Sequence, residues 1–131
     1  MKSLLLGAAL SATALGAATA APTDIKPARH DCFRSSQWSG WHAPDASTVY
    51  LRVNLRDIYR LDLNSPSQQL TWPGSHLVND VRGPDSVCTP IDLDLSVADN
   101  SFSGFKDHLF IKAITKLTPE QVAAIPKKDL P

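Results

Sequence analysis

Alternation of apolar and polar residues runs through most of this chain, and it constrains the fold more than any other sequence feature. The pattern is clearest in residues 91–97, which read Ile-Asp-Leu-Asp-Leu-Ser-Val. A period of two places every second side chain on the same face of a strand. Residues 91–97 are therefore predicted to form a half-buried β-strand, and residues 109–117 and, more weakly, 76–82 follow the same pattern.

Two further alternating runs, residues 48–53 and 57–63, lie close enough in sequence to form a hairpin. Asn54 to Arg56 would make the turn between them. We expect the inward side chains to be Val49, Leu51, Val53, Tyr59, Leu61 and Leu63.

Turn-forming residues separate these runs, so the chain is predicted to be mainly β, as a small antiparallel barrel or sandwich. One short C-terminal helix is expected to start with Thr118 as N-cap and Pro119 as the first helical residue. Gln121 would complete a capping box, and Pro126 would end the helix after about Ile125. If this helix packs on the sheet, the class becomes α+β.

The first twenty of the 131 residues resemble a secretory signal peptide. Lys2 supplies the positive start, an Ala- and Leu-rich run follows, and Ala18-Thr19-Ala20 gives the small-x-small cleavage pattern. The alternative is an uncleaved anchor, but the run is short and weakly apolar compared with the ~20 residues of a spanning helix. We expect a soluble protein, exported to the periplasm or beyond, with no membrane span after cleavage.

Past residue 20, we predict a flexible lead-in over residues 21–31, a single β-rich domain over 32–126 and a tail over 127–131. The two cysteines of the chain, Cys32 and Cys88, most simply form one disulfide in an exported protein. A disulfide between residues 32 and 88 would stabilise the fold by about 4 kcal/mol, because it lowers the conformational entropy of the unfolded chain. A redox pair or a metal site is the alternative, but neither cysteine belongs to a Cys-x-x-Cys motif.

Charge and motif content disfavour several function classes. The chain has 13 basic and 13 acidic residues, and the basic ones are scattered, which argues against a nucleic-acid partner. Its histidines, His30, His42, His76 and His108, show no metal-ligand spacing, so we expect surface or loop positions, no metal and no cofactor. The acidic residues after position 91 fail the calcium-loop pattern, because Val97 occupies the position that needs glycine.

The aromatic side chains near Cys32 are the most suggestive candidates for a site. Trp38, Trp41 and His42 lie close together, and Trp72 follows further along the chain. Exposed tryptophans on a β-scaffold often bind a partner. The alternative, which we favour, is that they pack over one end of the core and against the disulfide.

Several segments, taken in order, resemble a family of small exported Gram-negative bacterial proteins of unknown function. They are Cys32-Phe33-Arg34, Trp38, Trp41, residues 48–53 and 57–63, Arg82 to Cys88, and Ile111 to Glu120. The resemblance implies a second cysteine pair near Ser65 and Leu109, which this chain lacks. It therefore implies that Cys32 pairs with Cys88, and it implies no activity, cofactor or catalytic residue.

No nucleophile, zinc-hydrolase or phosphate-loop motif occurs in the sequence. The leading hypothesis is a non-catalytic binding module that recognises an unidentified protein or envelope ligand. The alternatives are a small periplasmic hydrolase with a His/Asp site assembled by folding, and a secreted inhibitor of a cell-wall enzyme.

Overall fold

The computed structural model describes residues 31–100 and 104–131. The predicted signal peptide and all but the last residue of the predicted lead-in lie outside this range. The strands are β1 (Phe33–Arg34), β2 (Trp38–Asp45), β3 (Thr48–Val53), β4 (Asp57–Leu63), β5 (His76–Asn79), β6 (Ser86–Val87), β7 (Leu95–Ala98), β8 (Lys106–His108) and β9 (Ile111–Lys116). The helical segments are η1 (Ser35–Gln37), η2 (Gln68–Thr71), η3 (Pro90–Asp92), α1 (Pro119–Ala123) and η4 (Lys127–Asp129).

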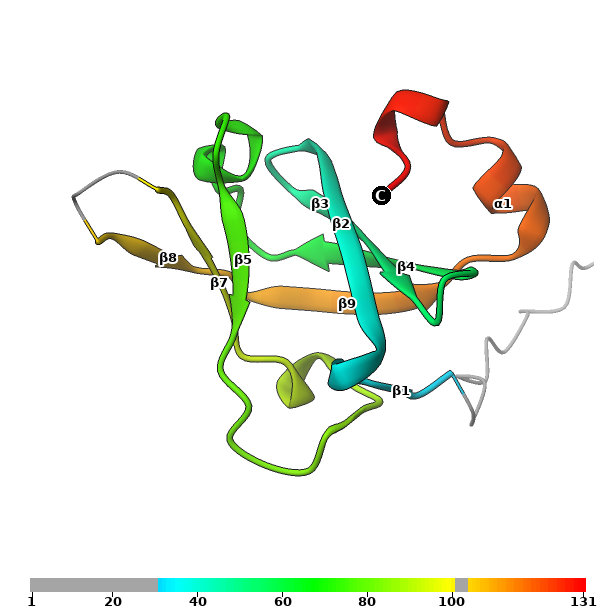
Figure 1. The fold of residues 1–131 in the computed structure, drawn as a ribbon, viewed down its shortest axis with the longest axis horizontal. Helices are drawn as coiled ribbons and strands as arrows, with labels where there is room; N and C mark the ends of the chain where they lie inside the picture. The colour runs from blue at the N-terminus through cyan, green and yellow to red at the C-terminus, as the bar shows by residue number, and fades with distance from the viewer. Residues whose placement is uncertain (1–30, 101–103) are drawn as a thin grey trace, which may run out of the picture.

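Three antiparallel sheets make up the fold, with strand orders β1-β6, β2-β3-β4-β9 and β5-β7-β8. The two larger sheets lie side by side (Figure 1). They are joined where β8 runs into β9: Leu109 N donates to Leu95 O (2.8 Å) and Asn64 N to Phe110 O (2.8 Å). The mainly β prediction is confirmed, and the fold is sandwich-like, because the sheets of the described residues do not close into a barrel.

The predicted hairpin is β3–β4, in register from Thr48↔Asp62 to Val53↔Asp57. Asn54 and Leu55 take positive φ values of 51° and 67°, the backbone that a tight hairpin turn requires. All six side chains predicted to point inward belong to the buried core cluster, which also contains Phe33, Leu70, Val87, Leu93, Leu95, Val97 and Leu109. The sequence pattern thus placed the central hairpin correctly.

The predicted strand over residues 91–97 is shorter than expected. Strand β7 begins at Leu95, and residues 90–92 form the turn η3 instead. Pro90 has no backbone N–H and a fixed φ, and Asp92 accepts hydrogen bonds from Thr89 N (2.8 Å) and Thr89 Oγ1 (3.0 Å). Ile91 consequently points out into solvent rather than into the core.

The C-terminal helix α1 has the predicted cap. Gln121 N donates to Thr118 Oγ1 (3.3 Å), and Thr118 N donates to Gln121 Oε1 (2.9 Å). The helix ends at Ala123, two residues earlier than expected, and buries none of its side chains. It projects past the sheet edge in Figure 1, so the protein is mainly β rather than α+β.

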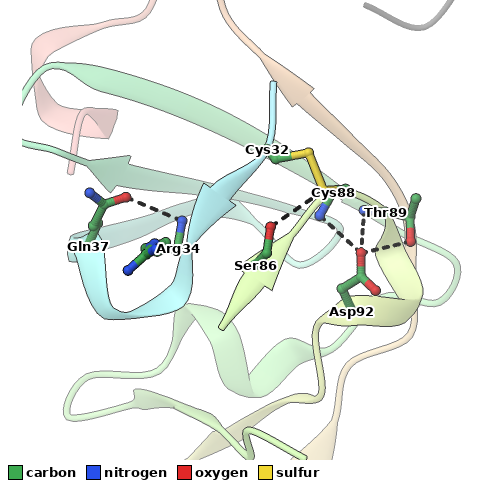
Figure 2. The surroundings of a disulfide bond; sticks show 7 residues. All are labelled: Cys32, Arg34, Gln37, Ser86, Cys88, Thr89 and Asp92. Atoms are coloured by element: carbon green, nitrogen blue, oxygen red, sulfur yellow. Dashed lines mark hydrogen bonds between the residues drawn. A yellow bond between two sulfur atoms is a disulfide. The ribbon is translucent and has the colours of Figure 1, made fainter. Parts of the chain in front are cut away.

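The disulfide joins Cys32 and Cys88 (Figure 2). Their Cα atoms are 4.3 Å apart. It lies directly beside the short β1–β6 pair, in which Phe33 is opposite Val87. Both of these side chains are buried, and the Phe33 ring lies 4.6 Å from that of Tyr59. The cross-link therefore fixes the start of the domain against the core.

Burial, together with the negative charges of Asp57 and Asp31, raises the pKa of Tyr59, whose phenol is therefore protonated at neutral pH.

Candidate functional site

The residues grouped as an aromatic patch differ in their burial and in the contacts they make. Trp38 and Trp41, both on β2, are partly buried and pack against the core. The indole Nε1 of Trp38 donates to Gly40 O at 2.7 Å. These contacts with the core are one part of the interpretation favoured from sequence, and the packing against the disulfide stays a prediction.

His42 faces the end of the chain. Its Nε2 lies 3.4 Å from Asp129 Oδ1. Two residues further on, Pro131 O accepts hydrogen bonds from Arg52, one of them from Nε at 2.7 Å. Residues 127–131, predicted as a tail, thus return to β2 and β3 and occupy the surface beside His42 (Figure 1).

Trp72 directly follows η2 and lines a hollow together with Phe105. Of the four residues proposed as a binding patch, Trp72 is the most exposed.

A cleft of about 600 Å³ lies within the usual size range of ligand sites. It is bounded by the loop that follows β5, by η3 and by the bend between β8 and β9. The loop and η3 lie below the two larger sheets in Figure 1. Its lining residues are Ser35, Asn64, Asn79, Asp80, Val81, Arg82, Gly83, Pro84, Val87, Pro90, Ile91, Asp92, Leu93, Asp94, His108, Leu109, Phe110 and Ile111.

Charged side chains form one wall of this cleft. Asp94 lies between Arg82 and His108: its Oδ2 is 3.0 Å from Arg82 Nε, and its Oδ1 is 3.3 Å from His108 Nδ1. The guanidinium is largely exposed and the imidazole half-exposed. Ion pairs as exposed as these contribute little to stability. Arg82, Asp94 and His108 could therefore exchange them for contacts with a ligand.

Apolar side chains form the rim. Ile91 is 92% exposed, Phe110 60% and Val81 58%. The Phe110 ring meets that of His108 edge to face, with centroids 4.7 Å apart. The three side chains come from separate segments of the chain and line the same cleft.

Hydrogen bonds and the disulfide hold the cleft loops in place. Asp85 accepts from the hydroxyls of Ser35 and Ser36 and from Ser36 N (3.0 Å). Asp92 accepts from Cys88 N (3.0 Å) and Thr89 N (2.8 Å), beside the cross-link in Figure 2.

The donors also shift the pKa values of the two carboxyl groups. The Ser35 hydroxyl, followed by the Ser36 groups, lowers the pKa of Asp85. The Cys88 amide, followed by the Thr89 amide, lowers the pKa of Asp92.

One polar atom at the cleft wall is unsatisfied. Asn79 Oδ1 is buried and accepts no hydrogen bond. An unpaired buried acceptor costs about 1–3 kcal/mol.

Sequence reasoning did not find this cleft. The period-two pattern puts Asp94 on the polar face of the predicted strand, and His108 is expected at a surface or loop position. Residues this far apart in sequence give no spacing signal that would join them in one site. The one available signal was Pro90, which directly precedes the alternating run and begins the turn that exposes Ile91. Among the described residues, no cluster of His, Cys, Asp and Glu is arranged to hold a metal ion.

Comparisons with protein-family models, with curated proteins and with solved structures found no match to this chain. The resemblance to an exported Gram-negative family therefore stays a prediction. Within residues 31–100 and 104–131, no helix is long and apolar enough to cross a membrane.

Proposed function

We propose that this protein is an exported, non-catalytic binding module that receives a segment of a partner protein in the cleft between η3 and the β8–β9 bend. The signal-like residues 1–20 and the Cys32–Cys88 disulfide support export, because such cross-links persist in oxidising compartments. The cleft supports binding.

The observation that carries the proposal is that three exposed apolar side chains, Val81, Ile91 and Phe110, line the same cleft. Each large apolar side chain contributes roughly 1.5–3 kcal/mol when it moves from water to a buried position. Their present exposure leaves most of that free energy available to a complex. A partner side chain that enters the cleft would bury all three.

The polar wall supplies specificity. Arg82 can donate to a partner carbonyl or carboxylate, and Asp94 can accept from a partner N–H. These groups already pair with each other, so a partner that offers no hydrogen bonds would leave them desolvated and unmatched. A mixed apolar and polar segment is the better fit.

The test is capture from envelope extract with three immobilised proteins: the wild type, Ile91→Ser/Phe110→Ser, and the control Leu55→Ser. Leu55 is 74% exposed at the β3–β4 turn, away from the cleft lining. We expect one partner to be recovered by the wild type and the control, and at least tenfold less by the double variant. Equal recovery by all three proteins, or no specific partner, would contradict the proposal.

A hydrolase is the second candidate, because His108 and Asp94 stand in the relation of a general base and the carboxylate that orients it. The serine in the cleft lining, Ser35, donates its hydroxyl to Asp85, so water would have to be the nucleophile. His108 would take the water proton as the oxygen attacks, and then return it to the leaving group. Turnover of chromogenic esters that disappears in His108→Gln would favour this candidate, whereas the binding module predicts none.

The third hypothesis, an inhibitor of a cell-wall enzyme, is decided by the captured partner. It requires that partner to be such an enzyme and to lose activity in the complex.

A further inference from the structure

A second hollow, of about 340 Å³, lies between η2 and β8. Its lining consists of Gln69, Trp72, Asp99, Phe105, Lys106 and Asp107. None of these residues lines the larger cleft, so any function of this hollow is separate from the one proposed above.

Two aromatic side chains stand open to solvent at this hollow. Trp72 is 54% exposed and Phe105 is 74% exposed. The backbone around Trp72 is held in place: Trp72 N donates to Gln69 O (3.2 Å), and Ser75 N donates to Trp72 O (3.2 Å). The indole is therefore displayed on a fixed turn, which reduces the entropy lost when a ligand stacks on it.

Polar side chains lie between the aromatic groups. Asp107 accepts a hydrogen bond from the hydroxyl of Ser67, a buried residue at the start of η2, which fixes the carboxylate at the hollow. Gln69 offers both a donor and an acceptor, and Lys106 offers donors. With Asp99 also in the lining, the site carries no excess positive charge for a phosphate or a nucleic acid.

We propose that this hollow binds a neutral saccharide. A pyranose ring has apolar C–H faces, which stack on an exposed indole or phenyl ring, and hydroxyl groups around its edge, which both donate and accept hydrogen bonds. The lining offers the complement of both features within one small volume. A purely apolar ligand would desolvate the polar groups of Gln69 and Lys106 without offering them hydrogen bonds.

The experiment is titration of the full chain with neutral cello-, chito- and malto-oligosaccharides, followed by calorimetry. The variants are Trp72→Ala, Phe105→Ala and Gln69→Ala, with Leu55→Ala as the matched control because Leu55 is as exposed as Phe105. We expect at least one probe to bind the wild type and the control equally, and Trp72→Ala to weaken that binding at least tenfold. Thermal unfolding of each variant separates loss of binding from loss of fold.

Three results would overturn the inference. They are no binding of any neutral probe, binding that survives both aromatic substitutions, and a preference for an anionic probe such as inorganic phosphate. Partner capture at the larger cleft does not depend on any of these outcomes, so the two proposals fail separately.

Discussion

Removal of the Cys32–Cys88 disulfide should lower the free energy of unfolding by about 4 kcal/mol. The cysteines are 56 positions apart in sequence. The loop-entropy relation for a cross-link of that span gives about 14 cal/mol/K, or about 4 kcal/mol at about 25 °C. That is a large share of the roughly 5–15 kcal/mol by which domains are stable.

The folded state should survive the loss. Both cysteines are exposed, and the contacts beside them do not depend on the cross-link. Phe33 and Val87, the opposed residues of β1 and β6, are 4% and 2% exposed, and burial of each contributes roughly 1.5–3 kcal/mol. We therefore expect β1 to stay on the core and the effect to arise in the unfolded chain, which gains conformational freedom.

Urea titrations of the oxidised protein, the reduced and alkylated protein, and Cys32→Ser/Cys88→Ser measure this directly. Tryptophan fluorescence and far-UV circular dichroism should report the same transition if unfolding is two-state. The m-value should rise without the cross-link, because the unfolded chain becomes less compact. A loss below about 1 kcal/mol, or an unchanged m-value, would refute the loop-entropy reasoning.

Three further outcomes are expected. Asp92→Asn should destabilise the protein by less than about 1 kcal/mol at neutral pH, because the carboxylate is exposed. Because the pKa of Asp92 is lowered in the folded protein, the carboxylate stabilises the fold above about pH 4 and stops doing so as the pH falls through the folded-state pKa. The urea midpoints of the variant and the wild type should therefore converge in acid. A gap that stays constant with pH would contradict this. Ser65→Cys/Leu109→Cys should form a second disulfide, because the two residues are next to Asn64 and Phe110, which share a backbone hydrogen bond. Intact-mass analysis without reductant should then show the loss of two further hydrogens. Free thiols would count against the family resemblance. Arg52→Ala should free residues 127–131, seen as faster amide exchange there, and unchanged exchange would show that other contacts hold them.

The hairpin and the helix cap were predictable because their determinants are local. The alternation in residues 48–53 and 57–63, with a short turn between them, specifies both the pairing and the buried face. The Thr118 cap depends on residues three positions apart. In contrast, Ile91 was placed on the wrong side because a period-two pattern carries no information about the capped turn that starts at Pro90.

By itself, the sequence determined a mainly β chain, its central hairpin, its capped helix and, through its two cysteines, the cross-link. The β class and the hairpin follow from short-range periodicity, and the helix cap follows from local hydrogen bonding. The disulfide follows because the sequence has two cysteines, so each has one possible partner within the chain. Only the tertiary structure decided which exposed side chains meet. It brought Arg82 and His108 to Asp94, set Trp72 beside Phe105, and returned residues 127–131 to β2. Such contacts depend on sheet packing and loop paths between distant segments, and these are set by the burial of the whole core.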